Sequence, residues 1–263
     1  MDFSARKHWF FDFDGTLFDT EEDIKLAWVA VLKLLKLETP DFEARYKTGP
    51  SLPDMARTLF PDRPDVERIV ADVKANFGRV YDDAGFPNTK PYPEAIAWIK
   101  ALKASGKELY VATNKRRRPT VMLLEKFGLL GLFTEVYTSD CLPGRTLRKP
   151  EYLAHALETR GIDPADAVMV GDTAIDVQGG RANGMGVKTV DWGYGTGPFY
   201  ARLARILDVP RVGAGTKFRE TPEWCSLVAF GVLAFLENSC GTALSVDDLA
   251  ACETAEDLFL RTC

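Results

Sequence analysis

An apolar run near the start of the chain leads two aspartates into a turn, and it predicts the first strand of a buried sheet. The stretch covers residues 9–19 and delivers Asp12 and Asp14 onto a turn closed by Gly15 and Thr16. A continuous apolar strand is typical of a parallel sheet, and its carboxyl end meets the edge where open α/β sheets bind ligands. Alternation would direct Asp12 and Asp14 to one side of the strand, and Phe11 and Phe13 to the other. Because an unpaired buried carboxylate costs several kcal/mol, the two aspartates require a metal ion, a proton or a cationic partner.

The stretch that follows has apolar positions at helical spacing, so residues 20–92 are predicted to form an all-helical insertion. An acidic first turn after Thr20 opens a helix that continues to about residue 37, and another helix covers about 65–81. Prolines break the segment 40–64, which contains a loop with Lys47, Gly49 and Ser51. That loop is either an ordinary connection between helices or a substrate loop.

From Tyr92 onward the pattern changes to strands that alternate with helices. Strands are predicted at 108–112, 135–138, 167–171 and 187–190, and the helices between them at 94–104, 120–127, 150–160 and 175–182. Such a succession of right-handed βαβ units folds into a doubly wound parallel sheet, so the fold class is α/β and Rossmann-like.

Polar residues suited to phosphate or metal follow several of these strands. They are Thr113, Asn114, Lys149, Asp172 and Asp176. Each one alone has an ordinary explanation as a helix cap or a turn residue. Because the carboxyl ends of parallel strands meet at one edge of the sheet, their combination favours a binding site there.

Residues 198–263 have a different pattern and are predicted to form a small helical region. Apolar positions recur at helical spacing after Ser226, and capped helix starts follow at Ser245 and near Thr254. The chain therefore divides into a core made of residues 1–19 and 93–197, an inserted helical cap at 20–92, and a helical extension at 198–263.

Composition limits the functions that this chain can have. It has 263 residues, of which 46% are hydrophobic and 27% charged, so it can bury a sizeable core. A net charge of −5 gives no reason to expect nucleic acid as a partner, and the basic run at 115–118 is better explained by local contacts. The short apolar run at the N-terminus fits neither a signal peptide nor a membrane span, so no membrane is expected and a cytoplasmic location follows by default.

Cysteines and histidines narrow the chemistry further. Five scattered cysteines without a CxxC pair argue against a disulfide framework or a zinc site, and they indicate a reducing compartment. Of the two histidines, His8 precedes the first strand and His155 lies in a predicted helix, and both are expected to be structural. Acid and base chemistry therefore falls to carboxylates.

These motifs resemble those of the haloacid dehalogenase-like hydrolase superfamily. Its first signature, Asp-x-Asp-Gly-Thr after a hydrophobic strand, is matched by Asp12, Asp14, Gly15 and Thr16. The later signatures are matched in order, so the resemblance covers residues 8 to about 195. The segment 190–195 and the helical insertion resemble the phosphoglycolate phosphatase-like branch. The resemblance implies a phosphatase, a phosphoric monoester hydrolase, that acts on a small phosphorylated metabolite such as a phosphoglycolate-like acid or a sugar phosphate.

The resemblance also implies roles for the two aspartates. Asp12 would attack phosphorus and form an aspartyl-phosphate, because a carboxylate is a nucleophile whose acyl phosphate hydrolyses readily. Asp14 would protonate the leaving oxygen and then deprotonate the attacking water. Mg²⁺ would be held by Asp12, by the backbone carbonyl of Asp14 and by Asp172.

Other residues would bind the transferring phosphoryl group or support the site. Thr113, Asn114 and Lys149 would bind phosphoryl oxygens, and Asp176 would orient Lys149 or a metal-bound water. Gly15 and Thr16 would form the supporting turn. In the cap, the loop with Lys47, Gly49 and Ser51 is similar to the cap loop that contacts the leaving group in such phosphatases. The carboxylate at Asp14 favours phosphoester hydrolysis, with phosphosugar mutase action as an alternative.

The extension shows a weaker resemblance to an acyl or peptidyl carrier protein. In that family an Asp-Ser-Leu motif carries the attachment serine, and here Cys225 precedes Ser226. Ser226 either carries a 4′-phosphopantetheine arm, with acyl-transfer enzymes as partners, or caps its helix in a domain used for docking. The alternative function is accordingly a carrier or docking protein in which the hydrolase core is a scaffold.

Overall fold

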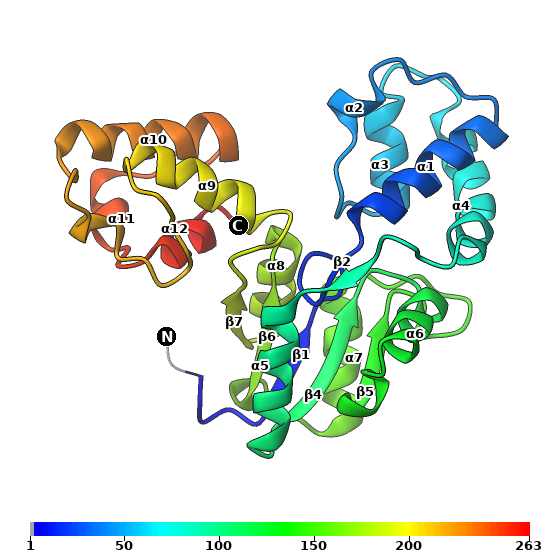
Figure 1. Ribbon diagram of the computed structural model, residues 1–263, viewed down its shortest axis with the longest axis horizontal. Coiled ribbons are helices and arrows are strands. Elements are labelled where there is room, and N and C mark those ends of the chain that lie inside the picture. Colours follow the sequence, from blue (N-terminus) through cyan, green and yellow to red (C-terminus); the bar gives the residue numbers. More distant parts are fainter. Residues whose placement is uncertain (1–2) are drawn as a thin grey trace. The chain divides into compact units, whose positions relative to one another are not determined.

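The structure is a computed structural model that describes residues 3–263. The chain forms two compact units. Figure 1 shows the chain coloured by residue number, from blue at the N-terminus to red at the C-terminus. The first unit contains the chain up to Asp12 together with Lys149–Cys263, and the second contains Phe13–Arg148. The domain boundaries expected from the sequence stay predictions.

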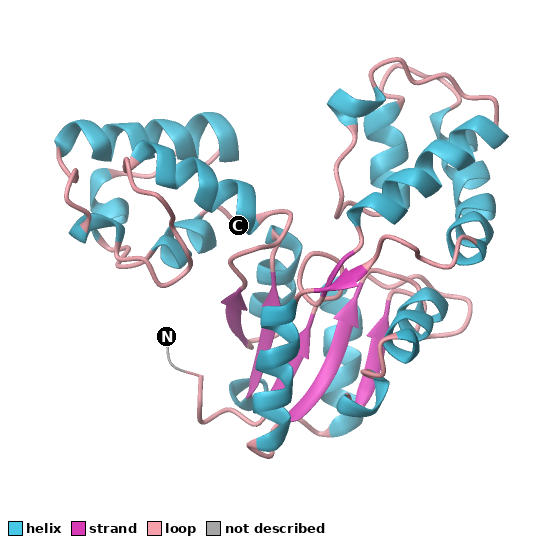
Figure 2. Cartoon of the chain, viewed as in Figure 1, coloured by secondary structure: helices cyan, strands magenta, loops and turns pink. Residues whose placement is uncertain are grey.

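A five-stranded parallel sheet confirms the predicted α/β fold class. Its strands, drawn in magenta in Figure 2, stand in the order β5-β4-β1-β6-β7. In the first unit β1 (His8–Phe11) pairs in parallel with β6 (Ala167–Gly171), and β6 pairs in parallel with β7 (Gly186–Thr189). In the second unit β4 (Glu108–Thr113) pairs in parallel with β5 (Glu135–Thr138).

Helices flank these strands close to the predicted positions. In the first unit α8 (Ala174–Ala182) packs on β6 and β7, and α7 (Lys149–Arg160) packs on α8. In the second unit α5 (Pro93–Ala104) packs on β4, and α6 (Arg117–Lys126) packs on β5. Short 3-10 turns lie at Leu130–Leu132 and Pro164–Asp166.

The predicted cap contains four helices and part of a small β-ribbon. The helices are α1 (Glu21–Leu34), α2 (Phe42–Arg45), α3 (Leu52–Leu59) and α4 (Val66–Asp83). Strand β2 (Phe18–Asp19) pairs antiparallel with β3 (Lys90–Pro91), so the expectation that residues 20–92 are all helical is wrong at β3. A two-residue strand has no periodicity that a sequence pattern can reveal.

The proline-rich segment 40–64 is also more regular than the sequence indicated. Ser51 is the N-cap of α3, and its hydroxyl accepts a hydrogen bond of 3.4 Å from the Asp54 backbone N–H. Pro53 lies in the first turn, where a missing N–H leaves no helical hydrogen bond unmade. This proline therefore helps to start a helix rather than break one.

A buried aspartate fastens α1 to the segment that returns from α4. Asp23 is 4% exposed, and its Oδ2 accepts hydrogen bonds from the backbone N–H and the hydroxyl of Thr89 at 2.7 and 2.6 Å. Its Oδ1 accepts one from the Asn88 side-chain amide at 2.9 Å. Four or more donors around one carboxylate compensate for its burial, so α1 has a defined position within its own unit.

The extension packs as part of the first unit. It contains α9 (Thr196–Ile206), α10 (Ser226–Cys240), α11 (Val246–Ala250) and α12 (Ala255–Arg261), with a 3-10 turn at Phe218–Glu220. Its aromatic and aliphatic side chains form one buried cluster that includes Val177 of α8. Among residues 3–263 no helix has both the length and the apolar character needed to cross a membrane.

Glu256 joins the extension to the sheet. Its carboxylate accepts hydrogen bonds from the Thr189 backbone N–H at 2.7 Å, the Thr189 hydroxyl at 2.9 Å and the Lys188 ammonium at 3.0 Å. Its own backbone N–H donates to the carbonyl of Ala214 at 3.0 Å. Helix α12 is thereby attached directly to strand β7.

Candidate active site

Asp12 lies directly beyond the end of strand β1. The strand ends at Phe11, and the Asp12 backbone N–H donates to the carbonyl of Val170 on β6 at 2.9 Å. The side chain is buried, with the whole residue 8% exposed. The expectation that Asp12 and Asp14 face one side of the strand stays a prediction.

Lys149 forms a buried ion pair with Asp12. Its Nζ lies 2.8 Å from Asp12 Oδ1, and it also contacts Asp176 Oδ1. Lys149 is only 2% exposed because it starts helix α7 inside the first unit. Burial by itself lowers the pKa of Lys149, but the negative charges of Asp12 and Asp176 outweigh it and raise that pKa well above the ordinary value. Lys149 is therefore a permanent ammonium group against Asp12.

Asp176 holds both Lys149 and the loop after strand β6. Its Oδ2 accepts hydrogen bonds from the Asp172 backbone N–H at 3.1 Å and from the Thr173 backbone N–H at 2.9 Å. A Cβ on Gly171 would lie 2.1 Å from Asp176 Cγ, so a glycine is required at this close approach. Asp176 thus contacts Lys149, as the sequence analysis expected, and it also shapes the loop that carries Asp172.

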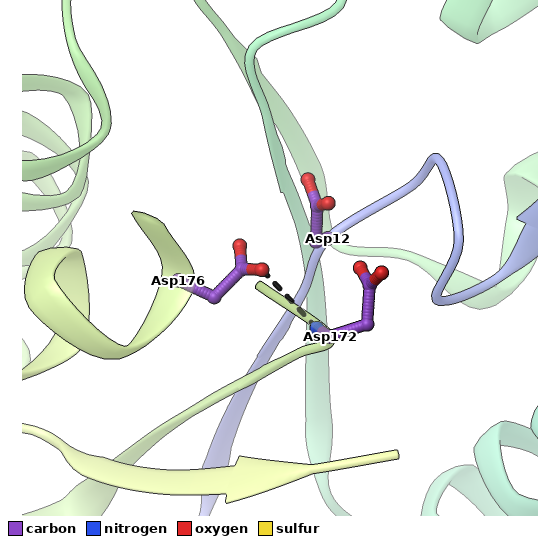
Figure 3. A group of neighbouring side chains, drawn as sticks. All are labelled: Asp12, Asp172 and Asp176. Atoms are coloured by element: carbon purple, nitrogen blue, oxygen red, sulfur yellow. Dashed lines mark hydrogen bonds between the residues drawn. The ribbon is translucent and has the colours of Figure 1, made fainter. Parts of the chain in front are cut away.

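Three buried carboxylates converge in the first unit, and Figure 3 shows them as sticks. Asp12, Asp172 and Asp176 each offer an oxygen, and these oxygens lie within 4.8 Å of one another. Three carboxylates outnumber the single ammonium of Lys149, so their repulsion favours a further cation. An all-oxygen set of ligands suits Mg²⁺. The donor set of this structure therefore fits the ion that the sequence motifs imply.

Two glycines after strand β7 were missed as supporting residues by the sequence analysis. A Cβ on Gly193 would lie 2.0 Å from Asp172 Cβ, and a Cβ on Gly195 would lie 2.4 Å from the Asp172 carbonyl oxygen. The Gly195 backbone N–H donates to Asp172 Oδ2 at 3.2 Å. The Gly-Tyr-Gly spacing just after a strand was the signal that could have revealed them. These glycines let the loop pack directly against Asp172 and hold it.

Asp14 has its own set of partners in the second unit. Its Oδ1 accepts hydrogen bonds from the Thr20 hydroxyl at 2.6 Å and from Lys115 Nζ at 2.9 Å. Lys115 also donates to the Tyr81 hydroxyl of α4 at 2.9 Å. No sequence motif indicated Thr20, Tyr81 and Lys115 as partners of Asp14, although Lys115 follows Thr113 and Asn114 directly.

Electrostatics keeps this second lysine charged as well. The Lys115 side chain is 6% exposed, and its Nζ lies 4.5 Å from the centre of the Tyr81 ring. Burial by itself lowers the pKa of Lys115, but the Asp14 charge and the Tyr81 hydroxyl outweigh it and raise that pKa. Burial also raises the pKa of Tyr81, which stays neutral. Lys115 therefore joins one carboxylate to one neutral phenol.

The expected phosphate-binding and turn residues of the second unit lie at strand ends and tight turns. Thr113 ends strand β4 and is 1% exposed, and its hydroxyl accepts a hydrogen bond of 3.2 Å from the Lys115 backbone N–H. The Asn114 carbonyl accepts one of 2.8 Å from the Ser139 hydroxyl. Gly15 has a φ of 81°, which favours glycine, and Thr16 is fully buried.

The cap loop residues have local contacts within the second unit. The Lys47 backbone N–H faces Met55 Sδ at 3.5 Å, Gly49 has a φ of 117°, and Ser51 caps α3. Next to them the Thr48 hydroxyl lies 3.1 Å from the Tyr46 hydroxyl and 3.3 Å from Glu21 Oε1. Roles for Lys47, Gly49 and Ser51 in substrate recognition stay predictions.

The basic run at 115–118 and Ser226 can also be placed. Arg116 forms an ion pair of 2.8 Å with Asp82, and Arg117 donates to the carbonyl of Val136 at 2.7 Å, so local contacts account for these two arginines. Ser226 is exposed and is the first residue of α10, whose N-cap is Cys225. Ser226 is therefore not the residue that caps this helix.

Comparison with known proteins identifies the family. The sequence model of the haloacid dehalogenase-like hydrolase family matches residues 9–190 of this chain. The chain is 32% identical over 186 residues to a phosphoglycolate phosphatase of Aquifex aeolicus, covering 70% of this chain and 84% of that protein. It is 33% identical over 211 residues to a phosphoglycolate phosphatase of Nitrosospira multiformis, covering 78% and 92%.

A solved structure agrees with these sequence matches. A haloacid dehalogenase-like family hydrolase from Streptococcus pneumoniae has a TM-score of 0.62 at 25% identity, and the match covers 73% of this chain and 88% of that one. The chain therefore belongs to the haloacid dehalogenase-like hydrolase family. Within it the protein is a phosphatase, an enzyme that hydrolyses phosphoric monoesters.

Proposed function

We propose that this phosphatase depends on Mg²⁺ and hydrolyses a small phosphorylated metabolite through an aspartyl-phosphate on Asp12. One observation carries the proposal, namely the buried Asp12 paired with Lys149 beside Asp172 and Asp176. A carboxylate paired with a fixed ammonium stays ionised, which a nucleophile requires. The relatives support phosphoester chemistry of this kind.

The reaction would proceed in two balanced steps. An oxygen of Asp12 attacks phosphorus, the ester P–O bond breaks, and Asp14 gives its proton to the leaving alcohol oxygen. Asp14 then takes a proton from water, whose oxygen attacks phosphorus and breaks the bond to Asp12. Inorganic phosphate leaves, and both aspartates return to their starting states.

The remaining residues would hold the transferring group. Thr113, Asn114 and Lys149 would bind the phosphoryl oxygens, and Asp176 would keep Lys149 oriented through the ion pair between them. Asp12, Asp172 and the backbone carbonyl of Asp14 would hold Mg²⁺. When bound, the ion supplies positive charge that lets an anionic substrate approach the carboxylates.

The substrate is proposed to be a phosphoglycolate-like acid or a sugar phosphate. Two of the matched relatives are described as phosphoglycolate phosphatases, which supports a small acid. The loop with Lys47, Gly49 and Ser51 would contact the leaving group. Phosphosugar mutase action is the rival within the same chemistry, and it differs by returning the phosphoryl group to a sugar instead of to water.

The test is a panel of phosphate esters assayed with Mg²⁺ and with EDTA. Wild-type protein should release phosphate only with Mg²⁺, and Asp12→Asn should lower kcat by about a thousandfold or more because the nucleophile is lost. Asp72→Asn, on the exposed surface of α4, is the matched control and should retain activity. Turnover in EDTA, or activity that survives Asp12→Asn, would contradict the proposal. Transfer to a second sugar without phosphate release would favour the mutase.

A second proposal concerns the extension, where Ser226 would be an attachment site for 4′-phosphopantetheine. Its exposure at the start of a 15-residue helix supports it, because an attached arm needs an accessible hydroxyl. Intact mass after incubation with coenzyme A and a phosphopantetheinyl transferase tests this, with Ser226→Ala as the control. A mass gain on the wild type alone would favour a working carrier that acyl-transfer enzymes could load. An unchanged mass of the wild type would exclude attachment of 4′-phosphopantetheine to Ser226 under those conditions.

A further inference from the structure

The Asp14 carboxylate is held through one of its two oxygens. The Thr20 hydroxyl and the Lys115 ammonium both donate to Oδ1, at 2.6 and 2.9 Å. Within residues 3–263 no donor is seen on Asp14 Oδ2. The two donors therefore fix the orientation of the carboxylate and leave Oδ2 available to exchange a proton.

Lys115 is itself held on two sides. Its Nζ donates to Tyr81 at 2.9 Å and lies 4.5 Å from the centre of that ring and 5.9 Å from the centre of the Phe13 ring. A lysine with a 6% exposed side chain and two fixed partners has little rotamer freedom left. Tyr81 belongs to α4, so the position of Lys115 depends on a helix of the predicted cap.

We infer that Lys115 is a positioning residue for Asp14, which it holds by Oδ1 and connects through the Tyr81 hydroxyl to helix α4. The inference rests on the proposed function, because it assumes that Asp14 moves the proton of the leaving group. Lys115 itself exchanges no proton and forms no bond to the substrate. Lys115 contributes by orienting the Asp14 carboxylate, so that Oδ2 faces the leaving group.

The test exploits the leaving group. An alkyl phosphate needs its leaving oxygen protonated, whereas p-nitrophenyl phosphate releases a stable phenolate that needs no proton. Lys115→Met should therefore lower kcat/KM for the alkyl ester by about a hundredfold, but for p-nitrophenyl phosphate by about threefold or less. Lys115→Arg should restore part of the loss, because a guanidinium can still donate to Oδ1. Tyr81→Phe should give a smaller loss with the same selectivity.

Lys126→Met is the matched control. Lys126 donates to the carbonyl oxygens of Gly85 and Phe86, at 3.1 and 2.7 Å, so it joins α6 to the segment after α4 without contacting Asp14. Replacing Lys126 should change kcat/KM by the same factor for the alkyl ester and for p-nitrophenyl phosphate. If Lys115→Met does not fold, Lys115→Arg and Tyr81→Phe make the same comparison.

The outcomes separate the inference from the proposed function. Equal losses on both esters in the Lys115 and Tyr81 variants would overturn the inference, as would a raised KM with unchanged kcat, which indicates direct substrate binding. If Asp12→Asn abolishes activity in the same panel, the proposed function survives that result. If Asp12→Asn remains active, the proposed function fails and the inference fails with it.

Discussion

Lys149 and Lys115 both have a buried ammonium-bearing side chain that pairs with an aspartate of the Asp-x-Asp motif, yet their surroundings differ. Lys149 is 2% exposed and contacts two carboxylates, Asp12 and Asp176. Lys115 contacts one carboxylate, Asp14, and a neutral phenol, Tyr81. The first lysine balances excess negative charge, whereas the second balances a single charge and gains its other contact from a helix of the predicted cap.

The two aspartates also differ in burial and in the groups that hold them. Asp12 is 8% exposed and follows directly on the sheet, where its backbone is hydrogen-bonded to β6. The Asp14 side chain is 18% exposed and is held at one oxygen by two donors. A nucleophile needs a fixed position, and a group that exchanges a proton needs an oxygen within reach of the substrate.

The largest expected effect is that of Lys149→Met. Removing the ammonium takes the cationic partner away from the buried carboxylates of Asp12 and Asp176, so the free energy of unfolding should fall by about 3–5 kcal/mol. Urea denaturation measures this change. Lys100→Met, at an exposed position of α5, is the control. A loss no larger than that of the control would show that the carboxylates do not depend on Lys149.

We expect Mg²⁺ to bind at the carboxylates near Lys149 and not at the side-chain carboxylate of Asp14. At a free concentration 100 times its Kd, the ion should stabilise the wild type by about 2.7 kcal/mol, seen as a raised Tm. Asp172→Asn should remove most of this gain because it deletes one of the carboxylates proposed to hold the ion. Asp14→Asn should retain most of it, since that substitution keeps the backbone carbonyl. Equal losses in both variants would place the Asp14 side chain among the ligands.

Lys115→Met should lower the free energy of unfolding by less than Lys149→Met does. We expect a loss of about 2 kcal/mol in the free energy of unfolding, because Asp14 is left with a hydrogen bond from Thr20 and some solvent contact. Adding Asp14→Asn should recover part of the loss, because the unpaired charge disappears. A double variant as unstable as the sum of the single variants would contradict coupling between Lys115 and Asp14.

Tyr81→Phe should have the smallest effect. It removes one hydrogen bond to Lys115 and keeps the ring in contact with the ammonium, so the expected loss is about 1 kcal/mol. Chemical denaturation measures it, with Tyr137→Phe on strand β5 as a tyrosine far from Asp14 in sequence and outside the predicted cap. A loss above that of Lys115→Met would mean that the Tyr81 hydroxyl has a structural role of its own.

Much of the fold followed from periodicity. Strands β5 and β6 have the predicted bounds, because apolar runs closed by turn residues are distinct signals. Helices α2 and α3 and strand β3 were missed, since short elements among prolines show no clear period. The start of α6 was placed three residues late, because its first turn is basic and lacks a capping residue.

The candidate site was predictable only where chain topology brings residues together. Lys149 and Asp12 are 137 residues apart. Asp12 directly follows strand β1 and Lys149 begins helix α7 after the loop beyond β5, so the alternation of strands and helices predicts both at the carboxyl edge of the sheet. The contact of Lys115 with Tyr81 depends instead on how α4 packs, and tertiary packing of this kind leaves no mark in local sequence. Thr20 has the sequence pattern of an ordinary helix start, so its hydrogen bond to Asp14 was not predictable either.

The contact of Glu256 with strand β7 has a consequence for the edge of the sheet. In the order β5-β4-β1-β6-β7, strand β7 stands at the end, where backbone N–H groups are open to a strand of another molecule. Glu256 occupies the Thr189 N–H with a charged side chain. A chain shortened to residue 197 would therefore expose a strand edge and an apolar face together, and we expect it to aggregate from dilute solution. In this chain Glu256 of the extension occupies one backbone donor of that edge.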